Sequence, residues 1–289
     1  MAKTDKRFLI NMIVIVVLGA LSGLFMGNYY VKNFMGGVTA DFLPTEAAIR
    51  DDVGAVVARC SGKSVTSLSA TDNFIMAEYK LSTRDYVHKS TKGTVTAAGV
   101  SQKLVSDKAY VAGEYFGEEI SSGVVKLATK YYWVKGAENV TTYDGSVSGL
   151  SANYSGAAAQ TKTLDAFNSE MGVKADQFIN YIVSSKTVKC QKYNGIVKGH
   201  HSFTIELDPV LAAKNYMYKV KKTSGSNEYP SFEKISFDFE IGDDWTIYSM
   251  HCRETYNVAI KLFGVPKKIK TTGDMTDTFS YDDNFVIPR

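Results

Sequence analysis

Hydrophobic and polar residues alternate most regularly in the last third of the chain. Phe237, Phe239 and Ile241 alternate with acidic residues, and a Gly-Asp-Asp turn at 242–244 leads into a second alternating run at 245–258. Because successive side chains of a strand point to opposite faces, this alternation predicts a long hairpin with one buried face. The side chains assigned to the buried face of the second strand are Tyr248, Met250, Cys252, Tyr256 and Val258.

Short runs rich in Val, Tyr and Thr predict further strands. Their near-regular spacing, with turn residues between them, indicates an antiparallel meander and not alternating βαβ units. Residues 144–161 are rich in Gly, Ser and Ala, which makes them a candidate internal linker or loop. The predicted strands cover 74–81, 93–97, 100–105, 109–116, 124–134, 187–193, 201–207 and 275–281.

Helix signals are fewer. Thr45 is placed as an N-cap before an apolar stripe that runs to Ser61. Asp208 followed by Pro209 is the clearest helix start, because Pro fits the first helical position, and this helix is predicted over 210–221. Shorter helical segments are predicted at 164–170 and 175–183.

The N-terminus carries the strongest hydropathy signal. Residues 8–26 contain no charge, and a helix of that length is about 28 Å long, close to the hydrocarbon core of a bilayer. Lys3, Lys6 and Arg7 precede the run, so the positive-inside rule places the N-terminus in the cytoplasm. The alternative is a signal peptide cleaved after Ala20-Leu21-Ser22, which would give a secreted protein.

The predicted fold class is therefore α+β. A transmembrane helix is followed by a β-rich antiparallel domain, a curved sheet or half-barrel, with a few packed helices. The predicted localisation is the cell membrane, single-pass, with the C-terminal domain outside the cytoplasm. The expected divisions are a cytoplasmic tail at 1–7, the anchor at 8–26, a juxtamembrane connector at 27–43 and the extracytoplasmic domain at 44–289.

The net charge bears on the possible partners of the protein, and the cysteine content bears on possible disulfides. The formal net charge of the 289-residue chain is +3, and the chain has no concentrated basic face of the kind that nucleic-acid binding requires. We therefore expect no nucleic-acid partner. Of the three cysteines, Cys190 and Cys252 lie in strand-like segments and are the candidate disulfide pair, although three buried thiols fit the sequence equally well.

The motifs of common catalytic sites are absent from the sequence. Ser61-Gly-Lys-Ser64 lacks the first Gly of a phosphate-binding loop, and Val147 occupies the nucleophile position of the Gly145–Gly149 run. The adjacent His200 and His201 would point to opposite faces of a strand. The sequence therefore predicts no catalytic residue, no metal site and no cofactor, and indicates a protein that is not an enzyme.

The order of elements resembles the LolA/LolB type of lipoprotein-carrier domain. The segments that carry the resemblance are Gly113-Glu-Tyr-Phe116, Trp245–Val258 and Met275–Tyr281. The resemblance implies a curved open barrel with helices on its concave side, which shelters lipid chains. No residue roles are carried over from that family.

Function is expected to reside in the concave side of the sheet. The first hypothesis is a binding protein for a lipid or lipidated ligand, working beside the bilayer. The alternatives are a structural or interaction subunit of a cell-envelope complex, with a protein partner, and an envelope hydrolase. The residues assigned to an apolar lining, each of which could instead fill a core, are Tyr115, Phe116, Tyr131, Trp133, Phe178, Tyr216, Phe237, Tyr248 and Met250.

Overall fold

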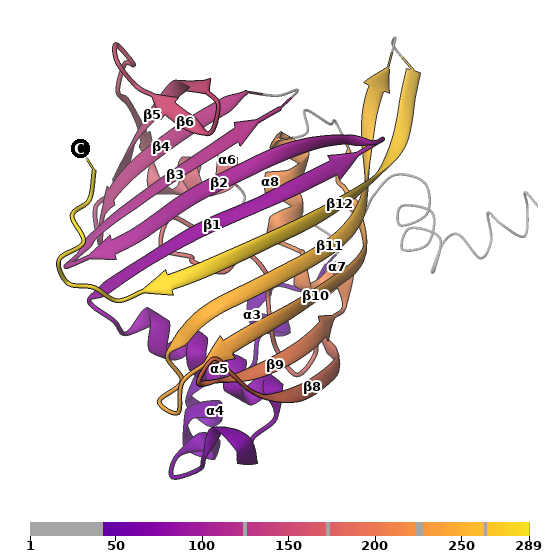
Figure 1. Ribbon diagram of the computed structural model, residues 1–289. Helices are drawn as coiled ribbons and strands as arrows, with labels where there is room; N and C mark the ends of the chain where they lie inside the picture. The colour runs from indigo at the N-terminus through magenta and orange to yellow at the C-terminus, as the bar shows by residue number, and fades with distance from the viewer. Residues whose placement is uncertain (1–42, 124–125, 172–173, 224–227, 263–264, 289) are drawn as a thin grey trace, which may run out of the picture.

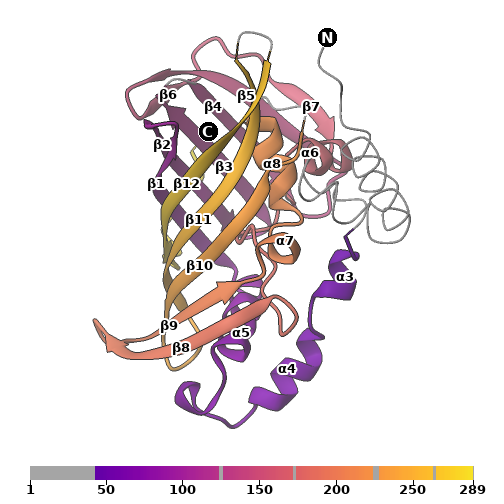
Figure 2. The same ribbon diagram turned by 90° about the vertical axis from the view of Figure 1, so that its right-hand side faces the viewer.

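A single antiparallel sheet forms the body of the protein (Figure 1). The computed structural model describes residues 43–123, 126–171, 174–223, 228–262 and 265–288. The sheet has 12 strands in the order β6-β5-β4-β3-β2-β1-β12-β11-β10-β9-β8, with β7 paired to β5. It is curved, and the helices lie against its concave side (Figure 2).

The sheet is built from two meanders that meet at its centre. The first runs outward from β1 and the second returns inward from β8, so that the first and last strands pair antiparallel. The first meander comprises β1 (Tyr86–Ala97), β2 (Val100–Val111), β3 (Glu114–Ser122), β4 (Leu127–Val134), β5 (Asn139–Ser148), β6 (Ser151–Asn153) and β7 (Gln160–Thr163). The second comprises β8 (Val188–Val197), β9 (His200–Leu207), β10 (Ser231–Ile241), β11 (Ile247–Leu262) and β12 (Val265–Ser280).

The predicted antiparallel meander is therefore confirmed, and so is the final hairpin, formed by β10 and β11. Residues 144–161, the candidate linker, contain the end of β5, all of β6 and the start of β7. The chain crosses from one edge of the sheet to the other through α6 (Leu164–Met171) and the residues between α6 and β8, of which 174–187 are described and form the crossing segment.

The helical segments differ from the predictions in four places. Residues 74–81, predicted as a strand, belong to α5 (Ala70–Ser82), which Ser69 caps by accepting a hydrogen bond from Asp72 N at 3.0 Å. A continuous apolar run is compatible with a buried strand or a buried helix, and here Phe74, Ala77 and Leu81 bury one helical face.

The predicted helix after Thr45 is two helices. Thr45 caps the short α3 (Glu46–Ile49), as expected, and Asp52 caps α4 (Val53–Cys60) by accepting from two backbone amides. A 3-10 turn, η3 (Val65–Ser67), then leads to α5.

The helix predicted over 210–221 is also interrupted. Asp208 caps α7 (Pro209–Ala212) as predicted, but α8 starts anew and spans Tyr216–Thr223. The carbonyl of Ala212 accepts a hydrogen bond from Ile182 N at 2.9 Å, so the crossing segment occupies an acceptor that a continuous helix would use. The crossing segment itself, predicted as a helix at 175–183, is irregular.

The membrane prediction requires correction. No helix among the described residues is long and apolar enough to span a bilayer. The longest of them, α5, has 13 residues and is about 20 Å long, against about 30 Å of hydrocarbon core. The predicted anchor at 8–26 lies outside the described residues, so the single-pass localisation and the transmembrane part of the fold class are unsupported.

The predicted disulfide is also wrong. Cys60, Cys190 and Cys252 are all free thiols, and Cys190 is exposed whereas Cys252 is buried. Cys190 lies on β8 and Cys252 on β11, with β9 and β10 between them. Three strand spacings amount to about 14 Å, well beyond the Cα separation that a disulfide can bridge.

Candidate ligand pocket on the concave face

The concave face is packed solid over one half of the sheet. Phe74 of α5 lies with its ring centroid 6.2 Å from that of Phe237 and 5.1 Å from that of Phe239, both on β10. Phe203 on β9 stacks on Phe239 at 5.2 Å. These rings are buried, so this half of the molecule is an ordinary hydrophobic core.

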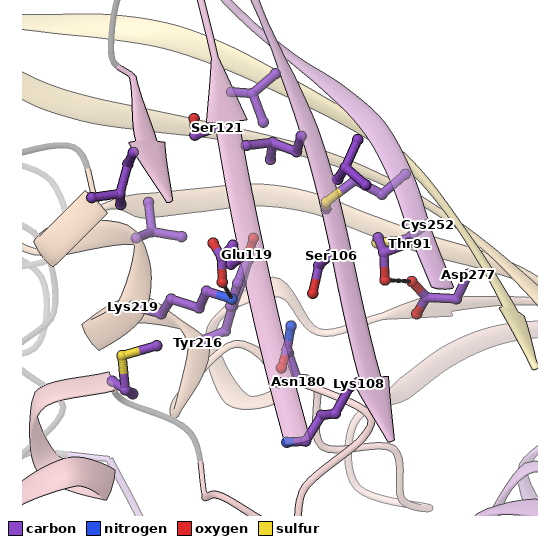
Figure 3. Close-up of a pocket in the computed structure, with 18 of the residues that line it drawn as sticks. Thr91, Ser106, Lys108, Glu119, Ser121, Asn180, Tyr216, Lys219, Cys252 and Asp277 are labelled. Atoms are coloured by element: carbon purple, nitrogen blue, oxygen red, sulfur yellow. Dashed lines mark hydrogen bonds and ion pairs between the residues drawn. The ribbon is translucent and has the colours of Figure 1, made fainter. Parts of the chain in front are cut away.

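The other half of the concave face encloses a pocket of about 710 Å³, within the size range of small-molecule sites. Its floor comes from β1–β4, β11 and β12, and α6, α8 and the crossing segment cover it (Figure 3). Its apolar lining includes Val95, Val100, Leu104, Leu127, Phe167, Met171, Phe178, Val220, Met250, Val258, Ile269 and Met275.

The strand register orders the pocket from an open end to a covered end. At the open end, Val100 and Leu127 are 52% and 37% exposed. At the covered end, the crossing segment is held down by side chains from the floor: Tyr131 donates to Ala175 O at 2.9 Å, and Lys89 donates to Phe178 O at 2.6 Å.

Polar side chains gather toward the covered end. Lys89 on β1 lies directly opposite Lys108 on β2, and both are buried. Lys89 Nζ is 3.4 Å from Asp277 Oδ2, and Thr91 donates to the other oxygen of Asp277 at 2.6 Å. Lys108 donates to the carbonyl of Gln177 and, at 3.3 Å, to that of Lys174.

Burial and the neighbouring Lys89 hold the pKa of Lys108 well below its ordinary value of 10.5. Its ammonium nitrogen also lies 5.7 Å and 5.5 Å from the ring centroids of Tyr131 and Phe178, over which a cation is attracted. Farther along the pocket, Lys219 of α8 forms an ion pair with Glu119 of β3 at 2.5 Å.

A glycine shapes the floor beside Lys108. Gly117 lies between Lys108 and Tyr131 in the register of β2, β3 and β4. A Cβ atom there would lie 2.1 Å from the Tyr131 ring, so only Gly allows the ring to lie flat on the strand.

Four of the nine residues predicted as apolar lining reach the pocket: Tyr131, Phe178, Tyr216 and Met250. They come from β4, the crossing segment, α8 and β11, which are distant in sequence. Contact of these four side chains with a ligand stays a prediction.

The other five predicted residues lie outside the pocket lining. Tyr115 and Trp133 are buried against each other, with ring centroids 5.2 Å apart, and Phe237 belongs to the solid core. Phe116 faces the opposite side of the sheet, where it packs with Ala109 and the C-terminal Ile287.

Tyr248 is 37% exposed and stacks on His200 at 3.9 Å. The prediction placed Tyr248 on the same buried face as Met250, because side chains alternate in a regular strand and residues two apart face the same side. A register shift between Glu240 and Ile241 interrupts that alternation, so Ile247 and Met250 are buried while Tyr248 faces outward.

One buried carboxylic acid lies close to the pocket. Glu254 on β11 is 3% exposed, accepts a short hydrogen bond from the pocket residue Tyr181, and leaves Oε1 without a partner. Burial raises the pKa of Glu254 to about 8. Gly273 lies opposite it on β12 and makes room, since a Cβ there would lie 2.5 Å from Oε1.

The thiol in the pocket lining is not activated. Cys252 is in the lining, but burial raises the pKa of its thiol well above the ordinary value, which keeps it protonated. Among the described residues, no group of His, Cys, Asp and Glu side chains is arranged to hold a metal ion.

The residues that sequence reasoning missed are the buried lysines. Lysine in an alternating strand usually faces solvent, and neither Lys89 nor Lys108 has a distinctive neighbour in sequence. Their spacing along two adjacent strands becomes meaningful only once the register places them opposite each other.

No family model and no curated protein matches this chain. Two solved structures are similar at 8% identity and a TM-score of 0.27: a DUF1329 family protein from Desulfovibrio piger, covering 74% of this chain and 93% of that one, and a LolA superfamily protein from Nitrosomonas europaea, covering 74% and 92%. A LolA superfamily structure is thus among the structures that this chain weakly resembles.

Proposed function

We propose that this protein binds a lipid-like ligand, with a long apolar chain, in the pocket on the concave side of its sheet. The observation that carries the proposal is the pocket itself. One half of the concave face is filled by α5, whereas the other half leaves about 710 Å³ lined mainly by aliphatic and aromatic side chains.

The energetics favour a long apolar chain. Each CH₂ group transferred from water to such a lining contributes about 0.8 kcal/mol, so an alkyl chain gains affinity with length until the pocket is full. The open end, with Val100 and Leu127 partly exposed, provides a route of entry. An interaction subunit with no ligand would have no need of an unfilled interior.

Ser106 offers a direct test. It lies in the pocket lining on β2, between Glu119 of β3 and Thr91 of β1 in the register (Figure 3). Ser106→Trp should fill the centre of the pocket and reduce binding of long-chain alcohols and acids, measured by displacement of a fluorescent fatty-chain probe, by at least tenfold. Ser101→Trp, on the same strand but exposed and outside the lining, is the matched control.

The expected result is saturable binding by the unmodified protein and by Ser101→Trp, with loss in Ser106→Trp. Circular dichroism and thermal melting establish that both variants are folded. If no long-chain compound binds the unmodified protein, or if both variants bind equally well, the proposal is overturned.

A further inference from the structure

The covered end of the pocket holds two lysines and a carboxylate in contact with one of them. Lys89 and Lys108 lie side by side on the floor, and among the described residues Asp277 is the only carboxylate in ion-pair contact with either of them. The partners of Lys108 are the carbonyls of Gln177 and Lys174, which accept hydrogen bonds but carry no charge.

Donors remain available at this end. An ammonium group has three N–H donors. Lys108 uses two of them on backbone carbonyls, and Lys89 uses one on Asp277 and one on the carbonyl of Phe178. Asn180 is also part of the lining (Figure 3), and its side-chain amide has no hydrogen-bond partner among the described residues. Three side chains of the lining therefore retain hydrogen-bond donors.

We propose that the covered end is an anion site, in which Lys108, Lys89 and Asn180 bind the carboxylate of a long-chain monocarboxylic acid whose alkyl chain extends toward Val100 and Leu127. This inference rests on the proposed function and names the ligand class. The head group lies inside and the methyl end faces the opening.

The charge balance selects a monoanion. The two lysines and Asp277 together carry one net positive charge when both lysines are protonated, and a single carboxylate neutralises it. Asp176, which also acts on Lys108, is exposed and lies outside the pocket lining. A phosphate monoester carries close to two negative charges at neutral pH and would leave one of them buried without a partner. The neighbouring Lys219 does not alter this count, because Glu119 pairs with it at 2.5 Å.

Binding of an anion should be linked to proton uptake. The pKa of Lys108 is lowered by burial and by Lys89 and Lys219, while Asp176 and Glu119 act in the opposite direction. A bound carboxylate adds a further negative charge next to the ammonium and favours its protonated form. The complex should therefore take up protons from the buffer as it forms.

The test compares palmitate with hexadecanol, which has the same chain and a neutral head, by titration calorimetry on the unmodified full chain, Lys108→Met and Lys103→Met. Lys103 is an exposed lysine on the same strand and outside the pocket lining, so it is the matched control. Palmitate should bind the unmodified protein and Lys103→Met about 10–100-fold more tightly than hexadecanol, since one or two charge-assisted hydrogen bonds distinguish them.

In Lys108→Met that preference should fall to less than threefold, while hexadecanol binding is retained. Proton uptake, measured with palmitate in buffers of different ionisation enthalpy, should disappear in the same variant. If neither compound binds the unmodified protein, the proposed function itself fails. If both bind equally well, or if Lys108→Met weakens both to the same extent by loosening the crossing segment, only the anion site is overturned.

A second measurement fixes the orientation of the chain. Trp133 lies one cross-strand row beyond Tyr131 at the covered end, opposite Tyr115. Palmitate brominated near its carboxylate should quench Trp133 fluorescence more strongly than palmitate brominated near its methyl end, and the difference should be lost in Trp133→Phe. The opposite order of quenching would refute the head-inside orientation.

Discussion

Glu254 is buried on β11, and only one of its two carboxyl oxygens is hydrogen-bonded. It forms no ion pair with any of the described residues. Burial raises its pKa from an ordinary value of 4.5 to about 8. In the unfolded chain the group ionises near its ordinary value. The folded protein therefore holds a proton on Glu254 over a pH range in which the unfolded chain has released it.

This difference makes folding stability depend on pH. Below about pH 4.5 both states are protonated, and Glu254 adds no pH dependence. As the pH rises from about 4.5 to about 8, the unfolded state alone loses the proton, and the free energy of unfolding falls by about 1.4 kcal/mol per pH unit. The total loss is roughly 5 kcal/mol at the upper end of this window, a large part of the stability of a typical domain.

Glu254→Gln removes the ionisation and keeps the size of the side chain and an oxygen that can accept the Tyr181 hydroxyl. Urea unfolding followed by circular dichroism, at intervals from pH 4.5 to 8.5, gives the free energy of unfolding of both proteins. The free energy of unfolding of the variant, relative to that of the unmodified protein, should increase steadily as the pH rises, by several kcal/mol at pH 8. Glu233→Gln, at an exposed position on β10, controls for the loss of one carboxyl group. A difference between Glu254→Gln and the unmodified protein that stays constant across this range would refute the buried-acid argument.

Three further substitutions test the packing and capping described above, each measured by urea unfolding at pH 7. Gly117→Ala should destabilise by about 1–3 kcal/mol, because its Cβ would displace the Tyr131 ring; an unchanged midpoint would show that the ring moves at no cost. Phe74→Ala should cost about 3–5 kcal/mol by leaving a void between α5 and β10, and a loss below 1 kcal/mol would contradict the packing. Asp208→Ala should cost about 1 kcal/mol, because two backbone amides of α7 lose their acceptor; no loss would mean that the cap is dispensable.

Local rules were enough for the features that depend on a few neighbouring residues. Alternation of apolar and acidic residues predicted the β10–β11 hairpin, because successive side chains of a strand point to opposite faces and the apolar ones mark the buried face. Thr45 and Asp208 were predicted as caps because the acceptor and the amides that it serves are at most three residues apart. The antiparallel plan followed from short strands and turns.

Other features depend on contacts between distant segments. Residues 74–81 form a helix and not a strand, and the apolar run alone is compatible with both until α5 packs on β10. The helix after Asp208 is interrupted where the backbone amide of Ile182, about 30 residues earlier in the chain, donates a hydrogen bond to the carbonyl of Ala212. The bulge that turns Tyr248 outward is likewise a property of paired strands.

The candidate site belongs almost entirely to this second class. Tyr131, Phe178, Tyr216 and Met250 were predicted as lining, but five residues of the same chemical kind lie elsewhere, because an aromatic side chain suits a solid core as well as a cavity. Lys108 was not predicted at all. A lysine in a strand is normally exposed, and only the register of the sheet and the crossing segment bury it beside Lys89. Chain periodicity determines which face a residue occupies, whereas the long-range packing decides which face is covered and where the covering leaves space.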